Sequence, residues 1–482
     1  MELSRLLSPV HAKSLTGAVD GVEITQLTCD SRQVTEGAMF VAVRGVAVDA
    51  HRFIPDTIAR GARAIVCEQL PETIHPNVSY IQVEDSNIAL AHLASQWFGN
   101  PSQRLRLVGV TGTNGKTTIA TLLYQLFRNL GHKAGLLSTV KNIIDTREVP
   151  ATQTTPDHLT LNRLLAEMVD AGCEYAFIEV SSHACAQHRI DGLTFAGGVF
   201  TNLTQDHLDY HKTMDEYLRA KKSFFDALPP EAFALTNLDD KNGRVMLQNC
   251  NARQATYSLR QIADFKTRLL EERLDGMSLL VDGKDVEVML TGRFNASNLT
   301  AIYGAAVLLG VDRADALLAL STLHPADGRF QTLQLPNGAT AIVDYAHTPD
   351  ALRNVLDTII DLVGTSKRKI ITVCGCGGNR DAAKRPIMAR IAAERSGQLI
   401  LTSDNPRNEN PDEILRQMQA GLNDEQARNA LVITDRRQAI RTARTLAQPG
   451  DIILVAGKGH ETYQEINGVK HHFDDREQLL QP

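Results

Sequence analysis

Apolar runs alternate with mixed segments in the first part of the chain. Residues 39–43 and 64–67 are continuous apolar runs that predict buried strands, and residues 56–61 are typical of the end of a helix. Apolar residues then recur with helical spacing over 87–98, and a Gly-Asn-Pro-Ser sequence breaks that pattern. Together these patterns predict a small α/β unit over residues 1–88.

From residue 105 the pattern becomes strand, glycine-rich turn, helix and strand. The apolar segments predict strands at 105–110, 176–180 and 198–202 and helices at 117–130 and 299–309. Strands that alternate with helices form largely parallel sheets covered on both faces. We therefore predict a central unit with a parallel sheet over residues 89–328, which ends in a polar, turn-rich stretch.

The last part of the chain, over residues 329–482, alternates in the same way. Strands are predicted at 340–344, 369–374, 398–402, 431–434 and 452–456. This pattern indicates a doubly wound, Rossmann-like domain, in which function gathers at the carboxyl ends of the strands. The residues at those ends are Asp344, Gly375, Asp404 and Gly457.

Composition supports an ordinary globular protein of about three α/β domains, since the chain has 482 residues, 43% hydrophobic and 22% charged. The net charge of −6 argues against a protein that coats nucleic acid. Seven cysteines without a CxxC pair favour reduced thiols and a cytoplasmic location. The chain lacks a signal-peptide pattern and any apolar run of about 18 residues, so we expect no membrane span.

Residues 111–118 (Thr-Gly-Thr-Asn-Gly-Lys-Thr-Thr) predict a phosphate-binding loop between a strand and a helix. Gly112 and Gly115 allow backbone N–H groups to face an anion, Lys116 supplies a positive charge, and Thr117 offers a hydroxyl to a magnesium ion. Val110 stands where the usual pattern has glycine. The alternative is a plain strand-to-helix turn with an exposed lysine.

Two further segments place polar groups directly after predicted strands. Glu179 ends an apolar strand, where magnesium beside ATP phosphates would be a suitable partner, although a structural ion pair is the alternative. His207 could bind a metal, with Asp206 or Asp209 orienting it. By itself this segment would fit zinc or a helix cap equally well. Spacing alone places Lys221 and the adjacent lysine on a solvated helix face.

Six segments in this order resemble the Mur ligases, the ATP-dependent amide-bond-forming enzymes of peptidoglycan precursor synthesis. They are residues 111–118, 179–183, 202–211, 292–295, 344–349 and 457–461. Within the family, residues 29–34 and 37–42 resemble the uridine-nucleotide domain of the enzymes that add the third peptide residue. Residues 404–407 (Asp-Asn-Pro-Arg) resemble the signature of the subgroup that adds meso-diaminopimelate. Asn379 departs from the aspartate expected in its loop.

The resemblance implies roles for individual residues, with Lys116, Lys221 and His207 as the catalytic set. ATP would contact Gly112, Thr113, Asn114, Gly115, Lys116, Thr117, Thr118, Asn295, Arg329 and Asp344. Mg²⁺ would be held by Thr117, Glu179, His207 and a carbamylated Lys221. The UDP-linked substrate would contact Ser31, Thr154, Thr155, Ser181, Gln187 and Arg189. Diaminopimelate would contact Arg380, Asp404, Asn405, Pro406, Arg407, Gly457 and Glu461.

The reaction that this resemblance implies joins meso-diaminopimelate to UDP-N-acetylmuramoyl-L-alanyl-D-glutamate. ATP would phosphorylate the D-glutamyl γ-carboxylate, and an amine of diaminopimelate would attack the acyl phosphate. The expected partners are these small molecules and ATP, with Mg²⁺ as cofactor and a monomeric chain. Three alternatives are an L-lysine-adding ligase of the same family, a folylpolyglutamate-type ligase, and a nucleotide-driven switch that hydrolyses ATP without an acceptor.

Overall fold

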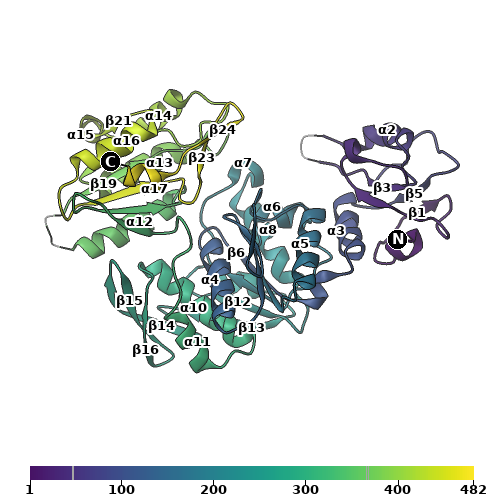
Figure 1. The fold of residues 1–482 in the computed structure, drawn as a ribbon, viewed down its shortest axis with the longest axis horizontal. Coiled ribbons are helices and arrows are strands. Elements are labelled where there is room, and N and C mark those ends of the chain that lie inside the picture. The colour runs from purple at the N-terminus through teal and green to yellow at the C-terminus, as the bar shows by residue number, and fades with distance from the viewer. Residues whose placement is uncertain (46–47, 365, 367, 482) are drawn as a thin grey trace.

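A computed structural model describes residues 1–45, 48–364, 366 and 368–481. The chain forms three α/β units in sequence order, with the purple N-terminal unit on one side of the central unit and the yellow-green C-terminal unit on the other (Figure 1). The predicted three-domain α/β class is therefore confirmed. The residue boundaries proposed for the domains stay predictions.

The N-terminal unit is a five-stranded sheet with the order β1-β5-β4-β3-β2, in which β1 is antiparallel to β5 and the other neighbours are parallel. Its elements are α1 (Leu3–Leu6), β1 (Ser14–Thr16), β2 (Gln26–Thr28), β3 (Ala38–Val41), α2 (Ile54–Ala59), β4 (Ala64–Cys67), β5 (Ser79–Gln82) and α3 (Ser86–Trp97). Helix α3 buries Ala89, Leu90 and Leu93 in the core of this unit. The helix therefore crosses the boundary predicted after residue 88.

The central unit is built on an eleven-stranded sheet with the order β16-β15-β14-β13-β12-β11-β6-β10-β7-β8-β9. Its elements are β6 (Arg106–Thr111), α4 (Lys116–Asn129), β7 (Ala134–Leu137), β8 (Asn142–Ile144), β9 (Arg147–Val149), α5 (His158–Asp170), β10 (Tyr175–Glu179), α6 (Ser182–Ala186), β11 (Gly197–Phe200), α7 (Leu208–His211), α8 (Met214–Asp226), β12 (Phe233–Asn237), α9 (Gly243–Leu247), β13 (Arg253–Ser258), β14 (Phe265–Arg273), β15 (Gly276–Val281), β16 (Lys284–Val288), α10 (Arg293–Leu308) and α11 (Arg313–Leu320).

The central sheet is largely parallel, as predicted, but its two edges are antiparallel. Strands β14, β15 and β16 form an antiparallel meander, and β7, β8 and β9 form another. The physical reason is visible in β14, where Phe265 and Thr267 are buried while Lys266 and Arg268 are exposed. A strand with one solvated face suits an antiparallel edge, whereas parallel strands are covered on both faces.

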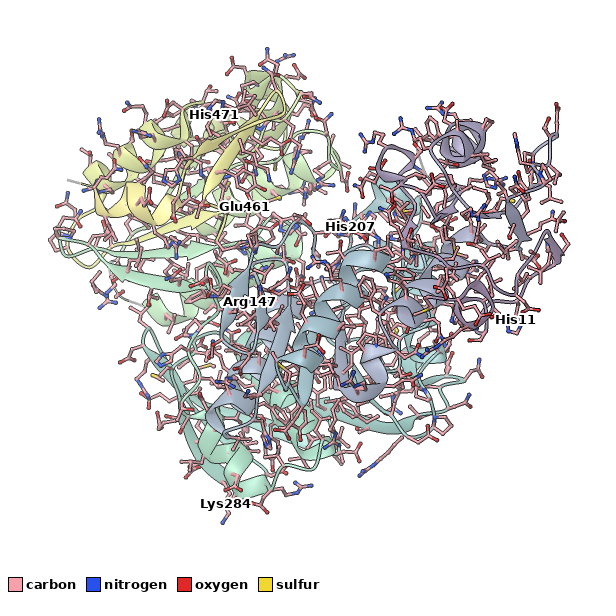
Figure 2. All side chains as sticks on the ribbon, turned by 45° about the vertical axis from the view of Figure 1, so that its right-hand side comes forward. His11, Arg147, His207, Lys284, Glu461 and His471 are labelled. Atoms are coloured by element: carbon pink, nitrogen blue, oxygen red, sulfur yellow. The ribbon has the colours of Figure 1, made fainter. Side chains whose placement is uncertain are left out.

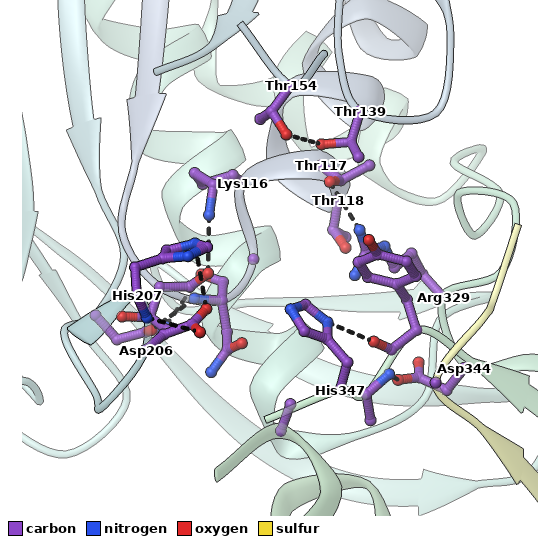
Figure 3. A pocket seen from close by; sticks show the side chains of 18 of the residues that line it. Lys116, Thr117, Thr118, Thr139, Thr154, Asp206, His207, Arg329, Asp344 and His347 are labelled. Atoms are coloured by element: carbon purple, nitrogen blue, oxygen red, sulfur yellow. Dashed lines mark hydrogen bonds and ion pairs between the residues drawn. The ribbon is translucent and has the colours of Figure 1, made fainter. Parts of the chain in front are cut away.

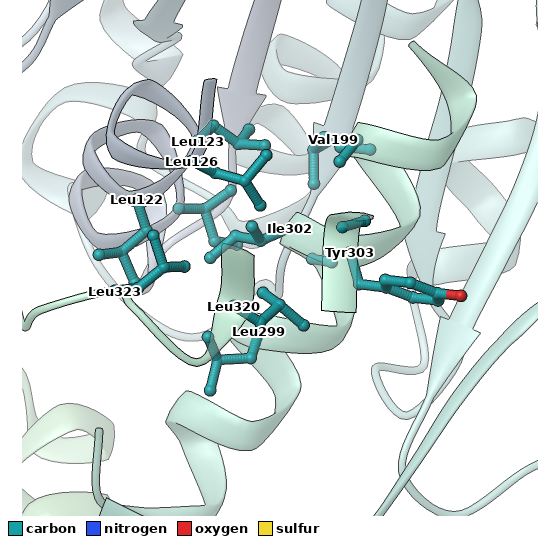
Figure 4. Close-up of a cluster of buried hydrophobic side chains, with 14 of the residues drawn as sticks. Leu122, Leu123, Leu126, Val199, Leu299, Ile302, Tyr303, Leu320 and Leu323 are labelled. Carbon is teal, nitrogen blue, oxygen red and sulfur yellow. The ribbon is translucent and has the colours of Figure 1, made fainter. Parts of the chain in front are cut away.

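Helices cover both faces of the central sheet. Leu122 and Leu126 of α4 pack with Ile302 of α10 and Leu320 of α11 over Val199 of the sheet (Figure 4). The opposite face is covered by α5, α6 and α8. This packing fixes the carboxyl end of β6 and the start of α4, between which the predicted phosphate loop lies.

The C-terminal unit is a six-stranded sheet with the order β17-β18-β22-β19-β20-β21, parallel except for β17 against β18. Its elements, with a separate hairpin β23-β24, are β17 (Gln331–Gln334), β18 (Thr340–Asp344), α12 (Pro349–Val363), β19 (Ile370–Cys374), α13 (Lys384–Arg395), β20 (Gln398–Leu401), α14 (Pro411–Gln419), α15 (Asp424–Asn429), β21 (Leu431–Val432), α16 (Arg436–Leu446), β22 (Ile452–Ala456), β23 (Tyr463–Ile466), β24 (Val469–His472) and α17 (Asp475–Leu480). Leu454 packs toward α12, α13 and α14, while Ile453 packs toward α16 and α17. The unit is therefore doubly wound, as predicted.

No helix in the described ranges is long and apolar enough to cross a membrane. The seven cysteines are all free thiols, and each of them except Cys29 is buried.

Candidate active site

The predicted phosphate loop lies between β6 and α4. Gly112 has a φ of 146°, and a Cβ atom at this position would lie 1.8 Å from the Thr201 hydroxyl, so the loop requires glycine there. Gly115, with a φ of 90°, leads directly into the helix, which begins at Lys116. Lys116 Nζ donates to the carbonyl oxygens of Gly112 and Thr113 at 2.9 and 2.8 Å (Figure 3). The lysine is thus folded over the loop and is not an exposed side chain.

The segment after β11 supports the phosphate loop from the side. Asn202 Oδ1 accepts a hydrogen bond from the Asn114 backbone N–H at 2.9 Å, and the Thr201 hydroxyl donates to the Asn114 carbonyl at 2.6 Å. The predicted strand 198–202 ends at Phe200, because the next two residues leave the sheet to make these bonds. The apolar pattern of the sequence does not show that Thr201 and Asn202 bond to the backbone of Asn114 in the phosphate loop.

Glu179 lies at the carboxyl end of β10, beside β6, and is 1% exposed. Its carboxylate accepts from the Thr139 backbone N–H at 2.7 Å and from the Thr139 hydroxyl at 3.2 Å. The Thr139 hydroxyl in turn donates to Thr154 at 3.0 Å (Figure 3). Both partners of the carboxylate are uncharged groups of Thr139, so these bonds do not support the ion-pair alternative.

His207 lies in the segment after β11 that also carries Asn202. Its backbone has a left-handed conformation, with a φ of 55°. Its Nε2 atom lies 3.4 Å from Asp206 Oδ2, which agrees with the predicted orienting role of Asp206 (Figure 3). Burial lowers the pKa of His207 to about 3, so the imidazole is neutral near pH 7 and can act as a ligand.

Lys221 lies on α8 and is 1% exposed, so the expectation of a solvated face is wrong for this residue. Its Nζ donates to the Gly112 carbonyl at 2.8 Å and lies 4.8 Å from the centroid of the Tyr217 ring. Burial, followed by the charge of Lys116, lowers its pKa well below the usual range. Lys222, the next residue, instead pairs with Asp226 at the helix surface.

Thr117, Glu179, His207 and Lys221 line one cavity of about 430 Å³. No cluster of three or more His, Cys, Asp or Glu side chains is arranged to hold a metal within the described residues. The donors are one hydroxyl, one carboxylate and one neutral imidazole. This set fits Mg²⁺, which is usually bound through one or two carboxylates and completes its shell with water and substrate phosphates. It does not fit a closed zinc site.

The C-terminal unit reaches the phosphate loop through two direct contacts. Arg329 Nη2 donates to the Thr117 hydroxyl at 2.9 Å, and its guanidinium lies 4.5 Å from the Tyr345 ring centroid. Asn114 Nδ2 donates to Asp350 at 3.1 Å. These contacts place the predicted nucleotide residue Arg329 at the loop and add Asp350, which the sequence did not single out.

Asp344 and Asn295 were both predicted to contact the nucleotide. Asp344 ends β18 in the cavity wall and accepts from the backbone N–H groups of Phe330 and Ala346 at 2.6 and 2.8 Å. Asn295 is 3% exposed, and its amide donates to the Thr291 carbonyl at 2.7 Å. In the described part of the chain, the residues of α10 that line the cavity are Phe294, Ser297 and Asn298, and Asn295 lies behind them.

Most residues predicted for the UDP-linked substrate lie together beside Glu179. Arg189 donates to the Thr155 carbonyl at 2.8 Å and to Gln187 Oε1 at 2.6 Å, while the Thr155 hydroxyl donates to the Glu179 carbonyl at 2.7 Å. Thr154 and Ser181 line the cavity itself. Ser31 lies apart from them, at the start of a short turn in the N-terminal unit. The structure thus brings five of the six predicted residues together.

The residues predicted for diaminopimelate come from three strand ends of the C-terminal sheet. The cavity is lined there by Arg380, Asp404, Asn405, Arg407, Gly457 and Glu461, and Pro406 is buried next to them. Arg407 has a φ of 52°, and its guanidinium donates to the Gly378 carbonyl at 2.8 Å and lies 3.4 Å from Glu465. Arg407 is therefore a fixed member of this wall and not a loose surface residue.

Arg385 of this wall is not indicated by the sequence pattern, and the structure accounts for the departure at Asn379. Arg385 of α13 is 1% exposed and binds both oxygens of Glu409 at 2.9 and 3.0 Å, which ties α13 to the segment after β20. Asn379, the departure from the expected aspartate, has a φ of 52°, and its side chain accepts from the Asn408 backbone. Asparagine tolerates this left-handed conformation, so the loop accommodates the change.

Comparisons with known proteins agree with this geometry. Three family models match: "Mur ligase family, catalytic domain" over residues 23–98, "Mur ligase middle domain" over 110–306, and "Mur ligase, glutamate ligase domain" over 328–459. A UDP-N-acetylmuramoyl-L-alanyl-D-glutamate--2,6-diaminopimelate ligase of Parabacteroides distasonis is 60% identical, over 99% of this chain and 98% of its own. The same-named protein of Bacteroides fragilis is 57% identical over the same shares. A solved structure of a ligase with that name has a TM-score of 0.69 and 33% identity, and covers 99% of this chain and 98% of its own.

Proposed function

The chain belongs to the Mur ligase family, and we propose on this premise that it adds meso-2,6-diaminopimelate to UDP-N-acetylmuramoyl-L-alanyl-D-glutamate. It is an ATP-dependent, amide-bond-forming ligase of peptidoglycan precursor synthesis. The observation that carries the proposal is the shared cavity. Phosphate-loop residues such as Lys116 line one wall, and acceptor residues such as Arg407 and Glu461 line the other.

The first half of the reaction makes a good leaving group from the D-glutamyl γ-carboxylate. ATP phosphorylates this carboxylate, and phosphoryl transfer needs positioning and charge neutralisation more than covalent help. Lys116 and the backbone N–H groups of the loop supply positive charge at the phosphates. Arg329, which already lies at Thr117, can contact the same nucleotide from the C-terminal unit.

A magnesium ion held by Thr117, Glu179, His207 and a carbamylated Lys221 would neutralise phosphate charge as ATP reacts. Burial and the charge of Lys116 lower the pKa of Lys221, which favours the neutral amine, the form that adds to carbon dioxide. The nitrogen lone pair forms a bond to carbon, one carbon–oxygen π bond becomes an oxygen lone pair, and the nitrogen loses a proton. The product is an anion, which would attract the ammonium group of Lys116.

The second half of the reaction is attack of the diaminopimelate amine on the acyl phosphate. Holding both partners in one cavity could lower the barrier by roughly 7–11 kcal/mol. At the far amino-acid end, the guanidinium of Arg407 can bind a carboxylate through two parallel hydrogen bonds, and Glu461 can bind an ammonium group. L-Lysine lacks that distal carboxylate, which disfavours the lysine-adding alternative.

Each of the three units takes one substrate of the proposed reaction. We assign the N-terminal unit, including Ser31, to the uridine nucleotide, the central unit to ATP, and the C-terminal unit to the amino acid. A monomer suffices, because the two cavity walls come from one chain. A cytoplasmic location fits the use of ATP and a nucleotide-linked substrate.

Release of phosphate and formation of the UDP-linked tripeptide test the proposal. Each substrate is omitted in turn, and the acceptor is varied among meso-diaminopimelate, L-lysine and glutamate. We expect turnover only with both substrates and meso-diaminopimelate, with discrimination against lysine on the order of 10⁴. ATP hydrolysis that ignores both substrates would indicate the nucleotide switch, and efficient use of lysine or of a folate substrate with glutamate would support the other ligase alternatives.

A further inference from the structure

Lys458 follows β22 between two of the predicted acceptor residues, and its ammonium group is completely buried. Nζ donates to Asn405 Oδ1 at 3.0 Å and to Glu461 Oε2 at 3.2 Å, and its side chain has 0% exposure. A buried ammonium group is costly to desolvate unless it is paired and hydrogen-bonded. The predicted diaminopimelate residues that line the cavity form one wall, which we call the acceptor wall. The fold keeps the Lys458 charge behind this wall, where Glu461 and Asn405 are its partners.

The same lysine connects two segments that are far apart in the sequence. Asn405 follows β20 and Glu461 follows β22, and Asn405 Nδ2 also donates to Glu461 Oε2 at 2.7 Å. The amide oxygen of Asn405 accepts from Lys458 and from the Glu465 backbone N–H at 2.9 Å. Lys458, Asn405 and Glu461 therefore form a closed set of hydrogen bonds, which fixes the rotamers of two side chains that face the cavity.

The acceptor wall also holds two carboxylates that repel one another. Burial, and then the Asp404 carboxylate, raise the pKa of Glu461, and Lys458 opposes this shift. Burial would raise the pKa of Asp404 as well, but Lys458 and Arg436 lower it. Other titratable or charged groups near this region are Tyr345, Tyr463, His460, Glu465 and Arg407. Without Lys458, Glu461 would take up a proton more readily and attract an acceptor ammonium group less strongly.

We propose that Lys458 is a positioning residue for the amino-acid acceptor, because its ammonium group holds Glu461 and Asn405 in the orientation that receives diaminopimelate. This inference rests on the proposed function, which makes Glu461 the partner of an acceptor ammonium group. Lys458 itself does not line the cavity formed by the described residues. Its effect is therefore exerted through its two partners.

The test compares steady-state kinetics of the full-length enzyme with those of the K458M and K458R variants. K458M should raise the KM for diaminopimelate by about ten-fold to a hundred-fold, as expected for a lost charged hydrogen bond, while the KM for ATP changes by less than about two-fold. The acidic limb of kcat/KM for diaminopimelate should move to higher pH. K458R keeps the charge, so its KM for diaminopimelate and its acidic limb should lie between those of K458M and the parent. Lys284 is exposed at the far end of the central unit (Figure 2), so K284M is the matched control and should behave as the parent does.

If K458M does not fold, K458Q takes its place, because glutamine can still bond to Asn405 but carries no charge, and the same two shifts are expected. A folded variant with an unchanged KM for diaminopimelate and an unchanged acidic limb would overturn the inference. Equal rises in the KM for ATP and the KM for diaminopimelate, with an unchanged acidic limb, would also overturn the inference, since they indicate only a structural role. A parent enzyme that does not use diaminopimelate would instead overturn the proposed function, so the two failures are distinguishable.

Discussion

Lys116 and Lys221 donate hydrogen bonds to the same acceptor, the carbonyl oxygen of Gly112, at 2.9 and 2.8 Å. The two lysines come from different helices, α4 and α8, and their ammonium groups repel one another when both are protonated. Burial, followed by this neighbouring charge, lowers the pKa of Lys221. Conversion of Lys221 to a carbamate would replace the repulsion with attraction. The geometry therefore supplies a physical reason for a modified lysine at this position.

K221A should reduce kcat by about a hundred-fold or more, because a charge that stabilises the phosphoryl-transfer step is lost. Short carboxylates such as acetate should restore part of the activity by occupying the place of the carbamate. Phosphate release with and without acetate measures both effects. K222A is the matched control, since Lys222 bonds to Asp226 at the helix surface, and it should keep nearly full activity. Full activity in K221A without acetate would remove Lys221 from the site.

T117V should increase the Mg²⁺ concentration needed for half-maximal activity by about ten-fold, because the variant keeps the side-chain shape but loses the hydroxyl ligand. T117S keeps the hydroxyl and should resemble the parent. Chelation of divalent cations should abolish turnover in all three proteins. Titration of Mg²⁺ at saturating ATP provides the measurement. An identical Mg²⁺ requirement in T117V would show that Thr117 serves only as the partner of Arg329 at 2.9 Å.

R407A should raise the KM for diaminopimelate by about a hundred-fold and leave the KM for ATP nearly unchanged, because a guanidinium-to-carboxylate pair is lost. R407K should rescue little, since an ammonium group cannot form the two parallel bonds of the fork. Initial rates over a range of each substrate separate the two constants. A parallel rise in both constants would instead point to the support that Arg407 gives to Gly378.

Local patterns were sufficient to predict much of the fold. The strands 64–67, 340–344 and 452–456 have the predicted bounds, because buried parallel strands are continuous apolar runs. The start of α14 also follows from local chemistry, since the Asn410 side chain caps the helix by accepting from the Asp412 backbone N–H. The helix predicted at 299–309 begins earlier, at Arg293, because its first turns bury Asn295 and Asn298, which hydrophobic periodicity does not register.

Long-range partners set the limit of prediction at the site. Spacing along α8 cannot distinguish Lys221 from Lys222, since the difference arises from the phosphate loop more than a hundred positions earlier. Lys458 lies inside a predicted motif, yet its role depends on Asn405, which is 53 residues away. Contacts of this kind follow from how the strand ends meet and not from the residues next to them.

Acidification should destabilise the protein partly through His158, which begins α5 and is 7% exposed. Burial lowers its pKa from 6.5 to about 4, so between these values the unfolded chain binds a proton that the folded chain does not. Stability is therefore retained above pH 6.5 and falls as the pH drops toward 4. The loss through this residue is about 2 kcal/mol at about pH 5. The free energy of unfolding, measured with urea, should therefore fall less in H158Q than in the parent between about pH 8 and pH 5. An equal fall in both proteins would contradict this role of His158.

R436M should destabilise the C-terminal unit by about 3–5 kcal/mol, because Arg436 and Asp475 form a pair with both side chains at 0% exposure. Two bonds of 2.8 and 2.7 Å join the guanidinium to the carboxylate, and removal of the arginine leaves a buried charge without compensation. The double variant R436M/D475N removes that charge and should regain part of the loss. The exposed ion pair of Lys13 and Glu84, at 3.7 Å, provides the control. E84Q should lower the free energy of unfolding by less than about 1 kcal/mol. Urea unfolding of the four proteins gives the comparison. A double variant no more stable than R436M would show that the loss arises from packing around the arginine and not from the uncompensated carboxylate.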